Sequence, residues 1–357
     1  MTEPYEKGRG AQVNPSNRFA QNGYQTEQQY LEHLHKNGER LEQTPRTQPI
    51  KVKARSLVNK VNSPDIGKSW SMNPYQGCEH GCTYCYARNS HEYWGYSAGT
   101  DFETQILVKE NAPAVLEQTL QKPDWKPEPI MLSGNTDCYQ PLEKNYLLTR
   151  KLLQVCLKYR QPVGVITKNA LIQRDVDVLQ QLAAQNLVHV SLSVTTLDDK
   201  LRRKMEPRTA TVKRKLETIK LLAQNNIPVN VMMAPLIPGI NTHEILAVAE
   251  ATAQAGALGF EYTTVRLNGQ IAEIFMDWLR KNFPDRVQKV KHQIAELHGG
   301  KLNDSQFGRR IKGSGALAES LAQTVALARK KHFAGKALPP YNSADFLRLP
   351  RGQYSLF

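Results

Sequence analysis

Short β-branched runs alternate with helix-length amphipathic runs between residues 64 and 300, and this alternation constrains the fold more than any other feature of the sequence. It is typical of parallel βα units, in which a helix follows each strand and returns the chain for the next. The six predicted strands end at Tyr75, Ser133, Lys168, Val194, Ile237 and Leu267. Apolar residues recur at three and four in helical runs at 143–159, 174–185, 212–224 and 244–255. Six units predict an α/β fold with a partial (β/α)6 barrel, although a twisted doubly wound sheet has the same pattern.

Composition divides the chain into three regions. Residues 1–63 are rich in Gln, Asn, Glu and Lys without a sustained apolar period, which predicts a polar, disordered arm. The end of this arm, residues 49–62, mixes basic residues with Val and Leu in short alternation and favours either an edge strand or a nucleic-acid contact. Residues 64–300 form the predicted core domain, and residues 301–357 form a basic C-terminal extension.

The charge of the chain favours a polyanionic partner. Lys plus Arg number 47 against 33 Asp plus Glu, a net charge of +14, so nucleic acid is the first partner to consider. Basic residues at 309–312 stand beside glycines whose backbone can approach a phosphate closely. A second basic cluster, residues 329–331, closes a helix predicted to begin near Ala316, where positive charge also suits the helix C-terminus.

No apolar run approaches the ~20 residues of a membrane span, and the first ten residues lack the apolar core of a signal peptide. Five cysteines in 357 residues are too few for a disulfide scaffold. We therefore expect a cytoplasmic protein with reduced thiols and no membrane partner.

Three of the cysteines, Cys78, Cys82 and Cys85, form a C-x3-C-x2-C motif directly after the first predicted strand. Three thiolates on one short loop can bind three irons of a [4Fe–4S] cubane and leave the fourth iron open to a small molecule. The alternative is a zinc site completed by His80 or a distant ligand. Zinc sites normally draw their ligands from two separated pairs, and the sequence has no second such pair.

The loop, with the aromatic Tyr84 just before its last cysteine, resembles the signature of the radical SAM superfamily, and the resemblance covers residues 64–300. It implies a [4Fe–4S] cluster, S-adenosyl-L-methionine (SAM) on the open iron, and reductive cleavage of SAM to a 5′-deoxyadenosyl radical. It also implies an electron donor such as flavodoxin or ferredoxin. The cofactors carry the hard chemistry, and the protein positions them.

The resemblance assigns further cofactor-binding positions, one group per strand end. The second strand ends in a turn whose Gly134 matches the family and whose Asp137 has the right charge for the SAM ammonium group. The turn can also be read as a simple helix N-cap, and Arg208, a candidate for the SAM carboxylate, as a surface arginine. The full set of expected cofactor contacts is Tyr84, Ser133, Gly134, Asn135, Thr136, Asp137, Ser191, Ser193, Arg208, Ile237 and Gly239.

Within the superfamily the sequence most resembles spore photoproduct lyase and its DNA-repair-photolyase-like relatives, on the Cys82–Tyr86 segment, the run from Thr136 to Pro141, and Thr167–Lys168–Asn169. That lyase has a cysteine shortly before its cofactor-binding Ser-Asp that returns a hydrogen atom, and here no thiol occupies the place. The candidate hydrogen donors are therefore Tyr86, Cys138 and Tyr139, and we expect a different substrate.

The last five residues resemble the pentapeptide with which bacterial repair proteins bind the DNA sliding clamp, with Gln353 as the polar anchor and Leu356 and Phe357 as the apolar pair. The alternative is an apolar tail that packs on its own domain. The leading hypothesis is a radical SAM enzyme, lyase-like in its reaction, that acts on DNA. An RNA-modifying radical SAM enzyme and a clamp-associated binding module with a structural or redox cluster are the alternatives.

Overall fold

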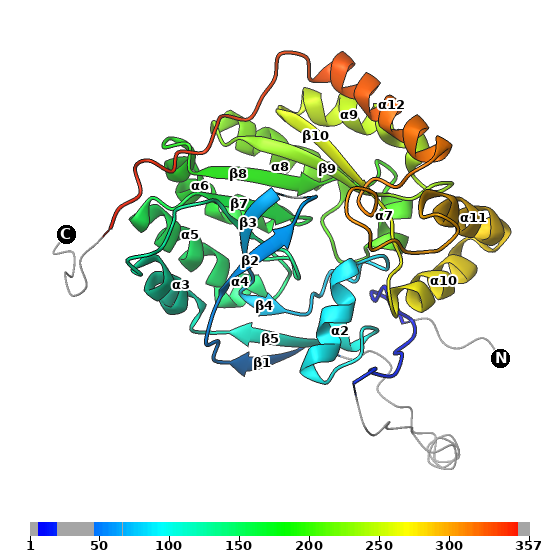
Figure 1. Ribbon diagram of the computed structural model, residues 1–357, viewed down its shortest axis with the longest axis horizontal. Helices are drawn as coiled ribbons and strands as arrows, with labels where there is room; N and C mark the ends of the chain where they lie inside the picture. The colour runs from blue at the N-terminus through cyan, green and yellow to red at the C-terminus, as the bar shows by residue number, and fades with distance from the viewer. Residues whose placement is uncertain (1–5, 20–45, 66, 349–357) are drawn as a thin grey trace, which may run out of the picture.

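A curled seven-stranded sheet forms the centre of the molecule (Figure 1). The computed structural model describes residues 6–19, 46–65 and 67–348. The strand order is β10-β9-β8-β7-β6-β3-β2; β3 and β6 to β10 are parallel, and β2 is antiparallel on the edge. The predicted partial (β/α)6 barrel is confirmed. The bounds are β2 Val58–Ser63, β3 Gly67–Met72, β6 Ile130–Leu132, β7 Val163–Thr167, β8 Val188–Ser193, β9 Val229–Leu236 and β10 Gly259–Thr264.

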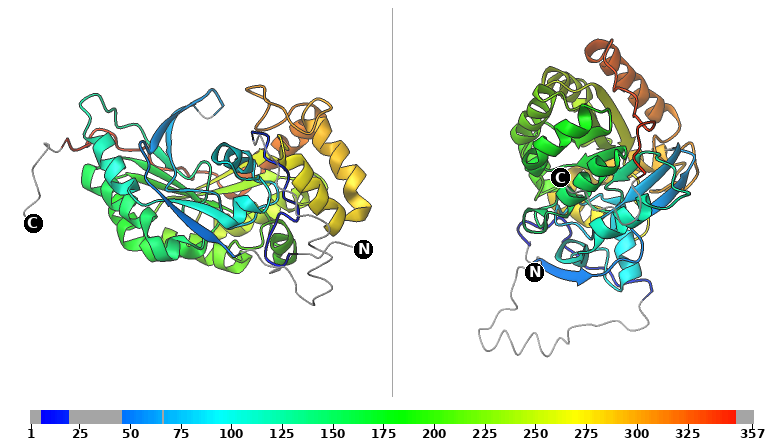
Figure 2. Two further views of the ribbon diagram at one scale, coloured as in Figure 1. Left: turned by 90° about the horizontal axis from the view of Figure 1, so that it is seen from below. Right: turned by 90° about the vertical axis from the view of Figure 1, so that its left-hand side faces the viewer.

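Helices between the strands cover the outer face of this sheet (Figures 1 and 2). Val188, Val190 and Leu192 of β8 point to that face and are fully buried against apolar side chains of the helices. Because side chains alternate along a strand, His189, Ser191 and Ser193 point to the concave face. The helices are α3 Ala112–Leu120, α4 Glu143–Tyr146, α5 Leu148–Tyr159, η2 Ala170–Asp175, α6 Val176–Ala183, α7 Asp199–Met205, α8 Val212–Gln224, η3 Thr242–Glu244 and α9 Ile245–Gln254.

The first predicted strand differs from the observed one. Strand β3 ends at Met72, three residues before the expected Tyr75. Pro74 has no N–H to donate, and the chain turns there into a second sheet of order β1-β5-β4. That sheet consists of β1 Gln48–Val52, β5 Gln105–Lys109 and β4 Tyr75–Gln76, with the short helix α2 Asp101–Thr104 before β5.

Residues 6–19 pack along the body of the protein, whereas the sequence analysis expected this segment to belong to a disordered arm. The buried carboxylate of Glu103 accepts hydrogen bonds from the backbone N–H of Gly10 and Ala11, at 3.0 and 2.8 Å. Arg18 forms an ion pair with buried Glu92 on η1 Tyr86–Trp94. We call residues 6–19 the N-terminal strap. The edge strand expected within residues 49–62 is confirmed, since β1 and β2 lie here and each stands at the edge of its sheet, whereas the division into arm, core and extension stays a prediction.

The C-terminal part adds helices beside β10 and then an extended segment. The helices are α10 Ile271–Asn282, η4 Pro284–Arg286, α11 Val287–Leu297 and α12 Ala316–His332. After α12 the chain runs past the sheet (Figure 1), and the Tyr341 ring stacks on His189 at 3.9 Å between centroids. No helix in the described ranges is long and apolar enough to cross a membrane. The predicted clamp-binding residues, Gln353 to Phe357, lie outside the described residues.

Candidate active site

The three cysteines lie together on the loop between β4 and η1, which we call the cysteine loop (residues 77–85). Cys78 and Cys82 are buried, and Cys85 is half-buried. Burial raises the pKa of the Cys82 and Cys85 thiols, and the neighbouring thiols raise it further. A bound metal cluster provides the positive charge that three crowded thiolates lack, so this donor set fits a [4Fe–4S] cluster. Among the described residues, no group of three or more His, Cys, Asp or Glu side chains is arranged to hold a single metal ion.

The run from Thr136 to Pro141 holds the cysteine loop from one side. The Gln140 side-chain oxygen accepts a hydrogen bond from the Glu79 N–H at 3.0 Å, and its amide donates to the Gly77 carbonyl at 3.3 Å. The Glu79 carboxylate in turn accepts from the Leu142 N–H at 2.6 Å. The segment that resembles the lyase family therefore positions the loop.

Asn73 fixes the turn after β6. Its side-chain oxygen accepts hydrogen bonds from the N–H groups of Gly134 and Asn135, at 2.8 and 3.0 Å. Ser133 adopts a positive φ of 84°, and its hydroxyl accepts from the Cys138 N–H at 2.9 Å. The Thr136 hydroxyl donates to the Gly77 carbonyl. The predicted turn thus lies beside the cysteine loop, with Asn73 as a support that the sequence analysis did not single out.

Asp137 lies in the site and has several protein partners, and its contact with the SAM ammonium group stays a prediction. Its carboxylate already accepts from the Tyr139 N–H, the Thr167 hydroxyl and the Lys168 N–H, each at 2.8 Å. Its fourth contact is His80, at 3.3 Å. With these four protein partners, Asp137 is a clamp between β6, β7 and the cysteine loop.

The imidazole of His80 is the cationic partner in this clamp. Burial alone would lower its pKa, but the charges of Asp137 and Cys78 outweigh burial and raise the pKa to about 10. The other ring nitrogen lies 3.2 Å from the Asn169 amide. His80 is thus held by side chains from two strand ends.

A buried group of charges lies behind the loop. The Glu206 carboxylate accepts from the Tyr84 hydroxyl at 3.0 Å and from Thr195, and it lies 3.5 Å from the Lys215 ammonium. Lys168 is half-buried beside this group: its ammonium lies 5.9 Å from the Tyr84 ring centre. Burial opposes the charge on Lys168, but the surrounding Cys82, Glu206 and Asp137 raise its pKa.

Sequence reasoning missed the roles of Lys168, Glu206 and Lys215. One signal was available: Lys215 shares the apolar face of its helix with Val212, Ile219 and Leu222. A lysine on such a face is expected to have a buried partner. Lys168 directly follows β7 and lies close enough to Cys82 and Cys85 for their charges to act on it, and sequence reasoning did not name it as a cofactor contact.

The remaining expected cofactor contacts are spread over two places. Ser193 is buried and Ser191 half-buried on the concave face of β8. Ile237 packs in one apolar cluster with Cys82 and Tyr84. A Cβ at Gly239 would point to α11 and meet Gln293 at 3.0 Å, and the cofactor contact of Gly239 stays a prediction.

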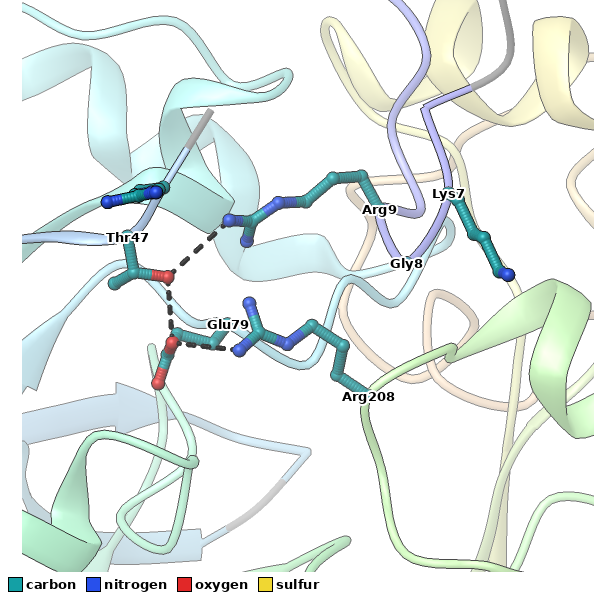
Figure 3. A pocket seen from close by; sticks show the side chains of 7 residues that line it. Lys7, Gly8, Arg9, Thr47, Glu79 and Arg208 are labelled. Carbon is teal, nitrogen blue, oxygen red and sulfur yellow. Dashed lines mark hydrogen bonds and ion pairs between the residues drawn. The ribbon is translucent and has the colours of Figure 1, made fainter. Parts of the chain in front are cut away.

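Arg208 points to the outer side of the cysteine loop. Its guanidinium pairs with Glu79 at 3.2 Å, and both line a pocket of about 480 Å³ (Figure 3). The other lining residues are Lys7, Gly8, Arg9, Arg46 and Thr47. Arg208 is therefore paired with Glu79 on the outer side of the cysteine loop, and its contact with the SAM carboxylate stays a prediction.

Of the three candidate hydrogen donors, the structure leaves one accessible. Cys138 and Tyr139 are fully buried in the main core, and the Tyr139 hydroxyl donates to Asp175 at 3.1 Å. Tyr86 is 54% exposed, and its hydroxyl donates to the Gly134 carbonyl at the turn after β6. Tyr86 is therefore the candidate whose phenol a substrate can reach.

The basic cluster at residues 309–312 links β10 to the β2–β3 turn. The Gly308 N–H and the Arg310 guanidinium both bind the Asp65 carboxylate, at 2.5 Å each. The ring of Phe307, half exposed, lies 4.4 Å from the Arg310 guanidinium carbon. The predicted phosphate-binding loop thus does bind an anion, and in this structure the anion is Asp65.

Comparisons with known proteins agree with this geometry. Residues 72–252 match the sequence profile of the radical SAM superfamily. An uncharacterised protein of Mycobacterium tuberculosis is 33% identical over 243 residues, covering 67% of this chain and 72% of that protein. One of Methanocaldococcus jannaschii is 27% identical, covering 69% and 88%. Spore photoproduct lyase in complex with dinucleoside spore photoproduct superposes with a TM-score of 0.60 over 80% of both chains at 13% identity, which is a likeness of fold.

Proposed function

The chain belongs to the radical SAM superfamily, and on that premise we propose that it acts on DNA by a repair-like, lyase-type radical reaction. Membership makes it a radical SAM enzyme whose cofactors are a [4Fe–4S] cluster and SAM. When bound, these cofactors supply a 5′-deoxyadenosyl radical that abstracts hydrogen from the substrate. The residues of this chain bind, orient and shield the reacting groups.

The proposed cluster ligands are Cys78, Cys82 and Cys85. Clamps on both sides of the loop, through Asp137 and Gln140, hold the thiols in place. For SAM, we propose that Lys168 pairs with the carboxylate, and that Ser193 and the turn at Gly134 contribute polar contacts. Tyr84, held by Glu206, provides an apolar wall beside the last cysteine.

The single observation that carries the choice of DNA is the exposed ring of Phe307 beside the Arg310 guanidinium. Burial lowers the pKa of Arg266, two residues after β10; the charge of Arg310 lowers it further and Tyr86 raises it, so these groups belong to one part of the molecule. Cations and an exposed ring in one part of the surface suit a substrate with phosphates and bases. The dinucleoside spore photoproduct bound by the lyase of similar fold supports a substrate of this class.

We propose that Tyr86 is the residue that returns a hydrogen atom. Its phenolic O–H would give one hydrogen atom to the substrate carbon radical, forming a C–H bond and leaving a tyrosyl radical. The phenol would be restored by one electron from the external electron donor and one proton from solvent.

The test is anaerobic reconstitution, reduction with dithionite in the presence of SAM, and assay of 5′-deoxyadenosine with and without ultraviolet-damaged DNA. The triple variant Cys78→Ala, Cys82→Ala, Cys85→Ala is the control. Cluster-dependent 5′-deoxyadenosine that rises with damaged DNA supports the proposal. Stimulation by single-stranded RNA and not by damaged DNA would favour RNA modification instead. For Tyr86→Phe we expect abortive 5′-deoxyadenosine with little repaired product.

A further inference from the structure

The pocket that Arg208 lines backs directly onto the cysteine loop (Figure 3). Glu79 of this pocket follows Cys78 in the chain, and the Arg208 N–H donates to the His80 carbonyl at 3.2 Å. One wall of the pocket is therefore the outer surface of the loop that carries the proposed cluster ligands. A molecule bound in it lies beside Cys78 without entering the barrel.

The pocket concentrates positive charge. Four cations line it and only one carboxylate, Glu79, which is already engaged by Thr47 at 2.8 Å and by Arg208. The guanidinium groups of Arg9 and Arg208 point into the same space (Figure 3), and Arg9 is buried. Burial and then the charge of Arg208 lower the pKa of Arg9. The excess of cations over carboxylates around this pocket favours an anionic partner.

The cations come from separate parts of the chain that only the fold brings together. Lys7 and Arg9 belong to the strap, Arg46 precedes β1, and Arg208 follows α7. The hydrogen bond between the Arg9 guanidinium and Thr47, at 3.5 Å, joins two of these parts at the mouth of the pocket. A shallow cationic depression of this kind suits the small, charged and short-lived interfaces of electron-transfer proteins.

The established family chemistry requires one electron from outside, and the features that suit DNA lie elsewhere, at Phe307, Arg310 and Tyr86. We propose that the cationic pocket is the docking site of an acidic one-electron carrier protein that reduces the cluster. This inference rests on the proposed function. In the transfer, the carrier is oxidised by one electron and the cluster is reduced by one, with no bond broken and no proton moved.

The test reverses two exposed charges that hold neither cofactor nor substrate, in the variant Lys7→Glu/Arg46→Glu. The matched control, Lys144→Glu/Lys151→Glu, makes the same change of net charge on exposed residues of α4 and α5. Each reconstituted protein is titrated with flavodoxin at low salt, and 5′-deoxyadenosine formation is measured with reduced flavodoxin and, separately, with dithionite.

We expect Lys7→Glu/Arg46→Glu to lower flavodoxin affinity and the flavodoxin-supported rate by about tenfold, because charge complementarity governs such encounters. The dithionite-supported rate should stay unchanged, since a small reductant needs no docking surface. The control should match wild type in both. Equal flavodoxin binding by the variant and wild type would overturn the docking site. A variant that binds DNA more weakly but keeps its affinity for flavodoxin would also overturn it, and would make the pocket a phosphate site. Absence of product with dithionite in wild type would instead refute the proposed function, whereas the binding titration would still decide the docking site.

Discussion

Gly10 lies so close to Gly81 that a Cβ atom at position 10 would stand 1.6 Å from the Gly81 carbonyl oxygen. The strap therefore touches the cysteine loop backbone to backbone, and only glycine fits at the contact. In Gly10→Ala the strap must leave the loop and give up the hydrogen bonds to Glu103. We expect a loss of about 2–4 kcal/mol in the free energy of unfolding and faster hydrogen exchange across residues 77–85.

Gly8→Ala is the matched control for that variant. Unlike Gly10, Gly8 has a positive φ, of 84°, and nothing lies within 4 Å of a Cβ at this position. The substitution should cost only the left-handed backbone strain, about 1 kcal/mol, and leave hydrogen exchange in the loop unchanged. If both variants behave alike, the close approach of strap and loop has no energetic role.

The buried pair of Glu206 and Lys215 gives a second prediction. Both side chains are almost fully buried, so Lys215→Met leaves the Glu206 carboxylate short of one counter-charge and should cost about 3 kcal/mol in urea unfolding. The double variant Glu206→Gln/Lys215→Met removes both charges and should recover part of that loss. Additive losses in the double variant would contradict a coupled pair.

His91 gives a third prediction, on pH dependence. Its ring is buried between Tyr96 and Phe102, and burial lowers its pKa from 6.5 to about 4. Between these values the unfolded chain binds a proton that the folded protein does not, so stability is lost as pH falls from 6.5 to 4 and the loss stops below 4. The loss of unfolding free energy over this pH range amounts to about 3 kcal/mol. The unfolding free energy of wild type relative to His91→Phe, measured from pH 7 to 4, should show this slope; a constant difference would refute it.

Strong local periodicity explains which parts of the fold could be predicted from the sequence. The helix expected at 212–224 has those bounds, and the strand expected to end at Lys168 ends at Thr167. In both, the pattern of buried apolar residues extends over the whole element. The sheet containing Tyr75 and Gln76 was not predicted because its partner strands begin at residues 48 and 105, and no local pattern reports such pairing.

The same distinction applies to the site. The cysteine spacing is local and gave a specific hypothesis from three residues. Asp137 has the charge expected of an ammonium partner, but its hydrogen bonds to Thr167 and Lys168 come from the next strand. The strap looked disordered because its anchors, Glu92 and Glu103, lie more than 70 residues away in the chain. Residue type alone cannot show whether a charge is already satisfied.

Asp65 leads to the last prediction. Its carboxylate accepts hydrogen bonds from the Gly308 N–H and the Arg310 guanidinium, and these two contacts lower the pKa of Asp65. A backbone N–H and a guanidinium are also the kinds of group that bind a phosphate. If the surface at Phe307 and Arg310 binds DNA, Asp65 competes with a phosphate for these two groups. Asp65→Asn should therefore tighten DNA binding and make the slope of log K against log salt steeper by about one charge.

The control for this variant is Asp345→Asn, which makes the same change of net charge at an exposed residue near the other end of the chain. Binding of a duplex oligonucleotide, followed by fluorescence anisotropy from 50 to 200 mM salt, compares the two on the same axis. A general electrostatic effect would shift both variants equally. A larger gain and a steeper slope in Asp65→Asn alone would place a phosphate at the Gly308–Arg310 loop, whereas equal curves would show that the loop only fastens β10 to the β2–β3 turn.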